Sequence, residues 1–287
     1  MFRTLLALIA ALVFSIAALA QQVPDEAQTA NVGSAATSSK PQTQIPAATP
    51  AATSNCTYTF TSGGTASVKY LQYCITVNGN VAEFQSPLGT EHIRVGTVGD
   101  GYALCDLSAA SGEVGYHDYA GFGDVDTGTG WGVPVLVSQT TAAVKIARTT
   151  ADGLFTLTQT FTQSASDASV KVAMAIKNNT SIAKTIWLTR FTDIDAGGTT
   201  SNIMDGTVES VWGYSASETG SGLQISLAAP NTFNNFGLAI NQVDNACAIG
   251  AGYNGLLNGV DGFAYSFHFI IVPAHGTKTV TLKYKAI

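Results

Sequence analysis

The sequence has little charge and no basic cluster. Only 11% of its 287 residues are charged, the formal net charge is −6, and no run of Lys or Arg occurs. Nucleic-acid binding requires clustered basic residues that neutralise phosphates, and anionic membrane surfaces attract the same residues. Neither a nucleic acid nor a charged membrane surface is therefore an expected partner.

Several enzyme motifs are also absent. The segment 213–217 fails the Gly-x-Ser-x-Gly pattern at its last position. The sequence has no His-Glu-x-x-His zinc motif, no phosphate-binding loop ending in Lys-Ser or Lys-Thr, and no Cys-x-x-Cys pair. Nucleotide chemistry and zinc proteolysis are thus disfavoured. Glycoside cleavage by paired carboxylates stays open, because its residues have no fixed local spacing.

The N-terminal residues have the pattern of an export signal. Arg3 is followed by an apolar run over residues 5–20, and the Ala-Leu-Ala at 18–20 fits the small-x-small cleavage rule. This predicts a signal peptide over residues 1–20. The alternative is an uncleaved anchor, but the run is shorter than the ~20 residues that a membrane span needs. We expect the mature chain to be periplasmic or extracellular and not inserted in a membrane.

The next segment, residues 21–55, consists mostly of Ala, Thr, Ser, Gln and Pro and has no aromatic residue. Such a composition cannot bury enough apolar surface to offset the loss of chain entropy. A disordered tether or a plain N-terminal tail is expected here.

The remaining residues, 56–287, alternate with a period of two, which predicts strands. Apolar residues alternate with polar or small ones over the segments 155–161, 170–176, 223–227, 263–271 and 280–284. Turn signals such as Asn78-Gly79 separate these runs. We count roughly 14 to 17 strand-like runs and no amphipathic helix. The prediction is one all-β domain, a large antiparallel sandwich of two packed sheets.

Only four cysteines are present, and all follow the predicted signal: Cys56, Cys74, Cys105 and Cys247. An even number in an exported chain predicts two disulfides, for which three connectivities exist. The pairing Cys56–Cys74 would staple a local hairpin, and Cys105–Cys247 would then join the N-terminal half to the C-terminal half. The other two connectivities stay open.

Three segments resemble stretches of uncharacterised secreted bacterial proteins, notably from acidobacteria: residues 73–93, 152–159 and 190–196. The resemblance covers most of residues 56–287 and implies no particular activity.

The Asn-Gly-Asn turn at 78–80, the Phe-Gln-Ser-Pro-x-Gly-x-Glu-His-Ile run at 84–93 and the long Thr-rich strands are also distantly similar to the galactose mutarotase-like supersandwich family. That family includes aldose epimerases and the sheet domains of several polysaccharide-cleaving enzymes, so the likeness implies a supersandwich-like fold. Epimerases of the family use a His acid and a Glu base. The last glutamate here is Glu218, so the C-terminal strands lack the residue that would serve as the base.

Two loops read Asp-x-Asp-x-Gly, at residues 124–128 and 193–197. A hard cation such as Ca²⁺ takes several oxygen ligands at ~2.4 Å, which alternating carboxylates around a glycine bend can supply. Asp193 and Asp195 are the predicted Ca²⁺ ligands. The alternative is an ordinary turn, because Asp and Gly are common in turns.

Trp131 lies in the glycine-rich segment 128–132. A tryptophan on a loop can stack on a sugar ring, because it offers a flat apolar face that loses little entropy on binding. Tyr116, His117 and Tyr119 are close in sequence and complete the predicted ligand-binding set. The alternative is that Trp131 packs against the rim of a sheet.

The other tryptophans and histidines give weaker indications. Trp187 and Trp212 lie within strand-like runs and are predicted to be core. His92 and His117 each adjoin a carboxylate, but neighbouring strand residues point to opposite faces, so neither pair forms a catalytic dyad. His268 has the opposite parity from the aromatic residues of its strand, and would line a polar concave sheet or be solvated. No catalytic residue is assigned.

These observations lead to three functional hypotheses. The first is an exported, non-enzymatic binding or surface module with a glycan as its partner. The second, from the supersandwich likeness, is a carbohydrate-active enzyme of the epimerase or lyase kind. The third is a structural protein of the cell envelope.

Overall fold

The computed structural model describes residues 54–63, 70–93, 99–123, 127–207, 209–215, 221–228, 234–239, 246–247 and 256–287. The predicted signal peptide (1–20) and almost all of the predicted tether (21–55) lie outside these residues, as do Asp124 and Asp126 of one predicted acidic loop. No helix in the described part of the chain has the length and hydropathy needed to cross a bilayer.

The described residues form antiparallel strands and one 3-10 turn, η2 (Ala196–Gly198). The predicted all-β class is confirmed. The strands are β1 (Tyr58–Ser62), β2 (Leu71–Ile75), β3 (Val81–Gln85), β4 (Asp100–Asp106), β5 (Val114–Ala120), β6 (Thr127–Thr129), β7 (Val135–Gln139), β8 (Ala143–Thr149), β9 (Phe155–Gln163), β10 (Ser169–Asn178), β11 (Lys184–Ile194), β12 (Asn202–Gly206), β13 (Ser210–Ser215), β14 (Gly222–Leu227), β15 (Asn234–Ala239), β16 (Leu257–Val260), β17 (Gly262–Val272) and β18 (Thr277–Ala286).

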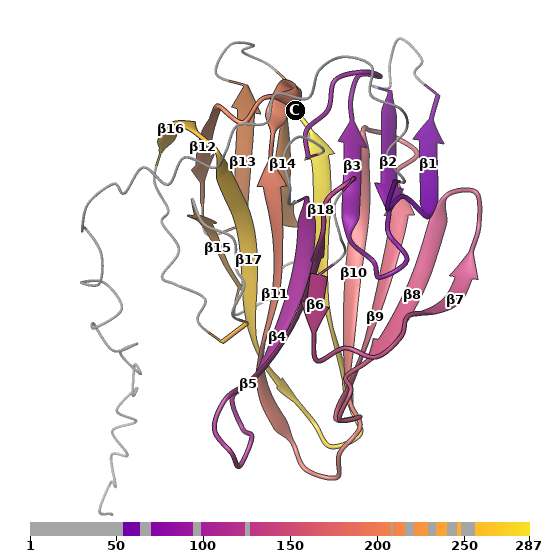
Figure 1. Cartoon of the computed structure of the whole chain (residues 1–287), viewed down its shortest axis with the longest axis vertical. Coiled ribbons are helices and arrows are strands. Elements are labelled where there is room, and N and C mark those ends of the chain that lie inside the picture. The colour runs from indigo at the N-terminus through magenta and orange to yellow at the C-terminus, as the bar shows by residue number, and fades with distance from the viewer. Residues whose placement is uncertain are drawn as a thin grey trace, which may run out of the picture. The chain divides into compact units, whose positions relative to one another are not determined.

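These strands make three sheets. The largest has nine strands in the order β16-β12-β13-β14-β18-β10-β9-β8-β7, and Figure 1 shows it running from β16 at one side to β7 at the other. The second has six strands in the order β15-β17-β11-β4-β5-β6, and the third is β1-β2-β3. The predicted antiparallel sandwich is thus confirmed, and the small third sheet is an addition to it.

The sheets pack face to face around one apolar core. Val172 of the nine-stranded sheet, Leu188 of the six-stranded sheet and Phe84 of the three-stranded sheet belong to the same buried cluster. Along β9 and β10 every second residue is buried, as the period of two requires. Each fully buried side chain of this kind contributes about 1.5–3 kcal/mol to folding.

A charged network crosses this core. Arg190 of β11 donates from Nε to the Tyr284 hydroxyl at 2.9 Å, donates from Nη1 to Gln159, and forms an ion pair with Asp100. Asp100 also accepts hydrogen bonds from Tyr284 at 2.7 Å and from Thr192 at 2.8 Å. A buried ion pair is tolerated only when its remaining polar atoms are also satisfied, and these contacts meet that requirement.

The predicted Asn78-Gly79 turn, between β2 and β3, lies beside this network. The Asn78 carbonyl accepts from the Tyr102 hydroxyl at 2.9 Å, and the Gly79 carbonyl accepts from Arg190 at 3.3 Å. Gly79 has a φ of 92°, and a Cβ at this position would lie 2.5 Å from the amide nitrogen of Gln159. The turn therefore needs glycine both for its backbone conformation and for its close approach to the core.

Two disulfides form, and they are the pairing considered above. Cys56–Cys74 has a Cα–Cα distance of 5.4 Å and closes a short segment. Cys105–Cys247 has a Cα–Cα distance of 5.1 Å and joins residues 142 positions apart. The second disulfide links β4 to the segment between β15 and β16.

The orientation of β17 corrects one expectation. Ser266, His268 and Ile270 are buried, whereas Phe269 and Ile271 are 44% and 59% exposed. The aromatic parity is therefore open to solvent only from Phe267 onward, because Phe263 and Tyr265 are buried with Phe191 in a second, smaller cluster. His268 faces the core instead of a polar surface. Alternation cannot tell the inner from the outer face of a strand that carries apolar residues on both.

Candidate functional site

The outer face of the six-stranded sheet carries a patch of aromatic side chains. On β11, Leu188 points into the core, so its neighbours Trp187 and Thr189 point outward. The register places Trp187 opposite Phe269 and Thr189 opposite Phe267. We call Trp187, Phe267 and Phe269 the aromatic patch.

Two rings of this patch are in contact, and the patch is partly open to solvent. The Trp187 and Phe267 centroids are 6.3 Å apart with an interplanar angle of 47°. Trp187 and Phe267 are half-buried, and Phe269 is exposed. Cys105 of β4 lies opposite Trp187 on its other side, so the Cys105–Cys247 disulfide borders the patch.

Further rings continue across the same face towards β5. The His117 and Tyr119 rings stack at 5.9 Å, and Tyr119 meets Phe191 at 6.2 Å. A Cβ on Gly101, between these strands, would lie 2.2 Å from Cζ of Phe191. The lack of a side chain at Gly101 on β4 therefore leaves room for the ring of Phe191, which comes from the neighbouring strand β11.

The four residues predicted as one ligand site are divided between two faces. Tyr116 is buried in the core cluster, and Trp131 packs against that cluster with its ring 5.5 Å from Tyr102 and 6.0 Å from Tyr116. His117 and Tyr119 instead lie on the outer face. Alternate residues of β5 point to opposite sides of the sheet, so the structure does not bring these four side chains to one face.

Trp187 and Trp212 also depart from expectation. Both are half-buried rather than core, and they lie on the outer faces of the six-stranded and nine-stranded sheets respectively. An aromatic residue in a strand-like run predicts a strand, but it does not predict whether the side chain lies on the inner or the outer face of the sheet.

An acidic cluster lies at the end of β11. Asp193 and Asp195 are fully buried, and Asp261 directly precedes β17, which pairs with β11. One carboxylate oxygen from each of the three lies within 4.8 Å of the others. Hard cations take carboxylate oxygens, so Asp193 and Asp195 stay the predicted Ca²⁺ ligands, with Asp261 as a third candidate.

Sequence reasoning named Asp193 and Asp195 but missed Asp261. Asp261 is distant in sequence and reaches the cluster because Ile194 and Gly262 are register partners. No local spacing in the sequence could have identified it.

The histidines lie in separate environments. His92 is buried with Nε2 2.9 Å from the Ser86 carbonyl oxygen, and its Nδ1 accepts from the Gly197 N–H at 3.3 Å. Burial lowers the pKa of His268 to about 3, and its Nε2 is 3.2 Å from the Ser266 hydroxyl. Within the residues that the structure describes, the contact of His117 is the stacking with Tyr119.

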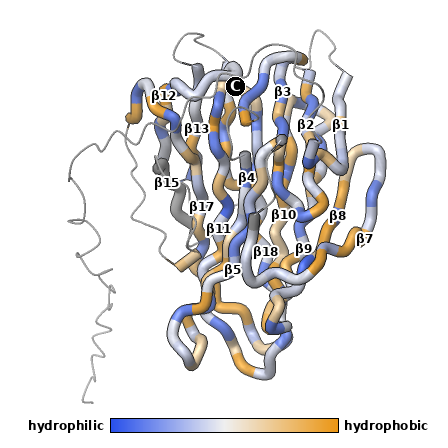
Figure 2. Tube along the Cα trace, in the orientation of Figure 1, coloured by the Kyte–Doolittle hydropathy of each residue, from blue (hydrophilic) through white to orange (hydrophobic). Residues whose placement is uncertain are grey.

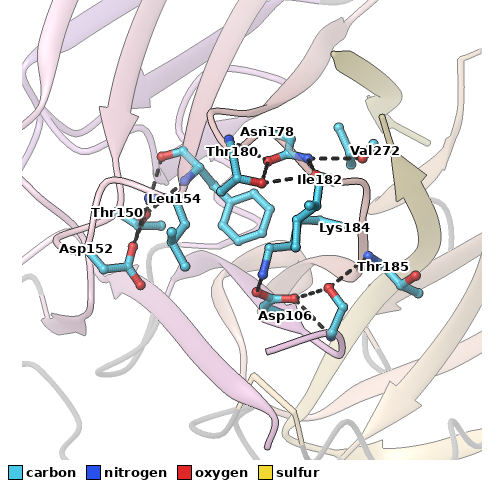
Figure 3. Close-up of polar contacts among 12 residues, drawn as sticks. Asp106, Thr150, Asp152, Leu154, Asn178, Thr180, Ile182, Lys184, Thr185 and Val272 are labelled. Atoms are coloured by element: carbon cyan, nitrogen blue, oxygen red, sulfur yellow. Dashed lines mark hydrogen bonds and ion pairs between the residues drawn. The ribbon is translucent and has the colours of Figure 1, made fainter. Parts of the chain in front are cut away.

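Another polar cluster, shown in Figure 3, joins the ends of the two main sheets. Lys184 is buried and its Nζ donates to Asp106 at 2.8 Å. The Asn178 amide donates to the carbonyls of Ile182 at 2.6 Å and Val272 at 3.2 Å. These contacts hold the β10–β11 connection against β17, which is a structural role.

Comparison with known proteins supports the fold. No family model matches the sequence, and no curated protein sequence matches it. The structure is similar to a protein of Escherichia coli K12 assigned as an aldose 1-epimerase, with a TM-score of 0.51, 9% identity, and coverage of 80% of this chain and 99% of that one. It is also similar to a bacterial glucoamylase complexed with acarbose, with a TM-score of 0.50, 7% identity, and coverage of 83% of this chain and 34% of that one. At these identities the likeness shows the fold alone, an all-β sandwich similar to that of the Escherichia coli protein.

Proposed function

We propose that this chain is an exported, non-enzymatic carbohydrate-binding module whose ligand surface is the aromatic patch. The observation that carries the proposal is the presence of Trp187, Phe267 and Phe269 side by side on two paired strands, partly open to solvent. Aromatic rings present flat apolar faces that stack on the C–H faces of sugar rings. Because these rings stand on strands of a large sheet, they are preorganised and lose little entropy on binding.

Two further observations support a carbohydrate ligand outside the cell. Proteins with the same fold are named as an aldose 1-epimerase and a glucoamylase. Two disulfides agree with an oxidising compartment, where such bonds persist. Binding without catalysis is favoured because His117, the histidine on this face, contacts a ring rather than a carboxylate.

The test is a glycan-array screen of the purified chain, followed by calorimetry with any glycan that binds. The Trp187→Ala and Phe269→Ala variants are compared with Trp212→Ala, which removes a half-buried tryptophan from the outer face of the other sheet. We expect both patch variants to weaken binding about tenfold or more, and Trp212→Ala to leave the affinity unchanged.

Each alternative outcome has a meaning. Failure of the wild-type chain to bind any glycan overturns the proposal and favours a structural envelope role. Release of reducing ends or interconversion of anomers by the wild-type chain would support the enzyme alternative. Equal loss of affinity in Trp187→Ala and Trp212→Ala would show that the patch is not the site.

A further inference from the structure

The accessible lysines of this acidic protein gather on one sheet. Among the basic residues that the structure describes, Arg148, Lys184 and Arg190 are buried in ion pairs. All the others lie on three strands of the nine-stranded sheet, β8, β10 and β18: Lys145, Lys171, Lys177, Lys278, Lys283 and Lys285. These strands are close together, in the order β18-β10-β9-β8. A basic surface therefore forms although the sequence has no run of basic residues.

The outer face of this sheet carries a pair of lysines directly opposite each other. Both neighbours of Lys171 on β10 are buried, so Lys171 points outward, and Figure 2 shows hydrophilic and hydrophobic residues interspersed along β9 and β10. The same alternation points Lys283 and Lys285 of β18 outward. The register places Lys171 opposite Lys283. Like charges at directly opposite positions repel, so the stability of the sheet does not explain this pair.

A groove crosses the outer face at the same place. It has a volume of about 390 Å³, and both Lys171 and Lys283 line it. Its other polar lining consists of Thr162, Gln163, Ser164 and Ser169. Sites of several hundred Å³ hold organic ligands, and hydroxyls, an amide and ammonium groups together suit a hydroxylated anion. We call this site the lysine groove.

The positive charge at the lysine groove is only partly neutralised. Lys283 donates from Nζ to Asp167 at 2.6 Å, and both side chains are partly exposed. Among the residues that the structure describes, Lys145, Lys171 and Lys285 form no ion pair. The strands β8, β9, β10 and β18 contain no acidic residue. Several charges of one sign along a cleft attract an oppositely charged ligand more strongly than one exposed lysine does.

We propose that the lysine groove binds an acidic polysaccharide, with carboxylates of the polymer at Lys171 and Lys283. Lys285 on β18 and Lys145 on β8 extend the basic surface beyond the groove, so a polymer with repeated charges meets more lysines than a small anion does. The hydroxyl and amide groups of the lining are partners for sugar hydroxyls. None of the residues that line the groove is aromatic, which disfavours stacking of nucleic-acid bases.

The lysine groove is distinct from the aromatic patch, because it lies on the other main sheet. The inference therefore goes beyond the proposed function and assigns a second ligand surface to the chain. It does not depend on ligand binding at the aromatic patch.

The test is calorimetry of the purified chain with oligogalacturonate, which carries a carboxylate on every sugar unit, and with its fully methyl-esterified form, which is neutral. We expect the acid form to bind and the ester not to bind. The affinity should fall as NaCl is added, because salt screens exposed charges. Lys171→Gln is expected to weaken binding of the acid form about fivefold or more.

The matched control is Lys177→Gln, which removes the same charge from the same face of β10 outside the groove. It should leave the affinity unchanged, as should Trp187→Ala at the aromatic patch. Far-UV circular dichroism confirms that each variant is folded. A loss of acid binding in Trp187→Ala would transfer the ligand to the patch and overturn this inference without affecting the proposed function.

Three other results would also overturn the proposal. The first is failure of the wild-type chain to bind the acid form at low salt. The second is equal weakening by Lys171→Gln and Lys177→Gln, which would mean that net charge and not the groove determines binding. The third is binding of a DNA duplex as tightly as the acid form, which would show a general surface for polyanions.

Discussion

The Arg190 side chain of β11 donates from Nε to the Tyr284 hydroxyl of β18 at 2.9 Å, and so joins the six-stranded sheet to the nine-stranded sheet. The guanidinium is fully buried and also forms an ion pair with Asp100. The two sheets are thereby held in one relative position by directional bonds, in addition to apolar packing, which is not directional.

Arg190→Met is expected to destabilise the fold by about 3–5 kcal/mol, because it leaves the Asp100 carboxylate buried without its counter-charge. The double variant Arg190→Met with Asp100→Leu removes both charges and is expected to recover part of that loss. Urea denaturation of the wild-type chain and of both variants measures the difference. A double variant less stable than Arg190→Met alone would contradict this account.

The two disulfides are expected to differ in their contribution to stability. In the chain-entropy account, closing the 142-residue separation of Cys105–Cys247 is worth about 5 kcal/mol, and closing the 18-residue separation of Cys56–Cys74 about 3 kcal/mol. Double Cys→Ala variants remove each disulfide in turn. Their thermal denaturation shows which disulfide contributes more to stability. A larger loss from removing Cys56–Cys74 would mean that native contacts, not loop closure, determine the effect.

Acid sensitivity is expected from His268. Burial lowers its pKa to about 3 in the folded state, whereas an unfolded histidine titrates near ~6.5. Between these values the unfolded chain binds a proton that the folded chain does not, so stability falls as the pH drops from 6.5 towards 3. The slope from this one residue is about 1.4 kcal/mol per pH unit.

The His268→Leu variant removes this proton-binding group. The free energy of unfolding is therefore expected to depend less on pH between the folded and unfolded pKa values of His268. Ile270→Val, at another buried position of β17, is the matched control: it keeps His268 and should leave the slope unchanged. Denaturant unfolding at pH 7, 6, 5 and 4 gives the profiles. Identical slopes for wild type and His268→Leu would show that other groups account for the acid sensitivity.

The Ca²⁺ prediction is tested at the acidic cluster. If Asp193, Asp195 and Asp261 share one ion, Ca²⁺ at a hundred times its dissociation constant stabilises the fold by about 2.7 kcal/mol relative to chelator. Asp261→Asn should weaken Ca²⁺ binding by calorimetry, whereas Asp205→Asn on β12 should not. No heat of binding and no shift in Tm with Ca²⁺ would assign the cluster to an ordinary turn.

The candidate site shows where sequence reasoning stops. The aromatic alternation of residues 263–271 was visible in the sequence, but its direction was not, because both parities of β17 carry residues that a core accepts. The position of Trp187 beside Phe269 depends on the pairing of β11 with β17, two strands separated by more than sixty positions along the chain. Pairing at that range is set by packing of the whole domain and leaves no local spacing signal.

By itself the sequence determined the local features of this protein. The period of two predicted the strands, the Asn-Gly turn at 78–79 predicted a hairpin, and the cysteine count predicted two disulfides, because each depends on residues that are close in the chain or on composition. Only the tertiary structure decided which faces became inner and outer, that Arg190 and Asp100 meet in the core, and that Asp261 joins Asp193. Those outcomes depend on which strands pair and how the sheets stack, and that choice minimises the free energy of the whole domain rather than of any one segment.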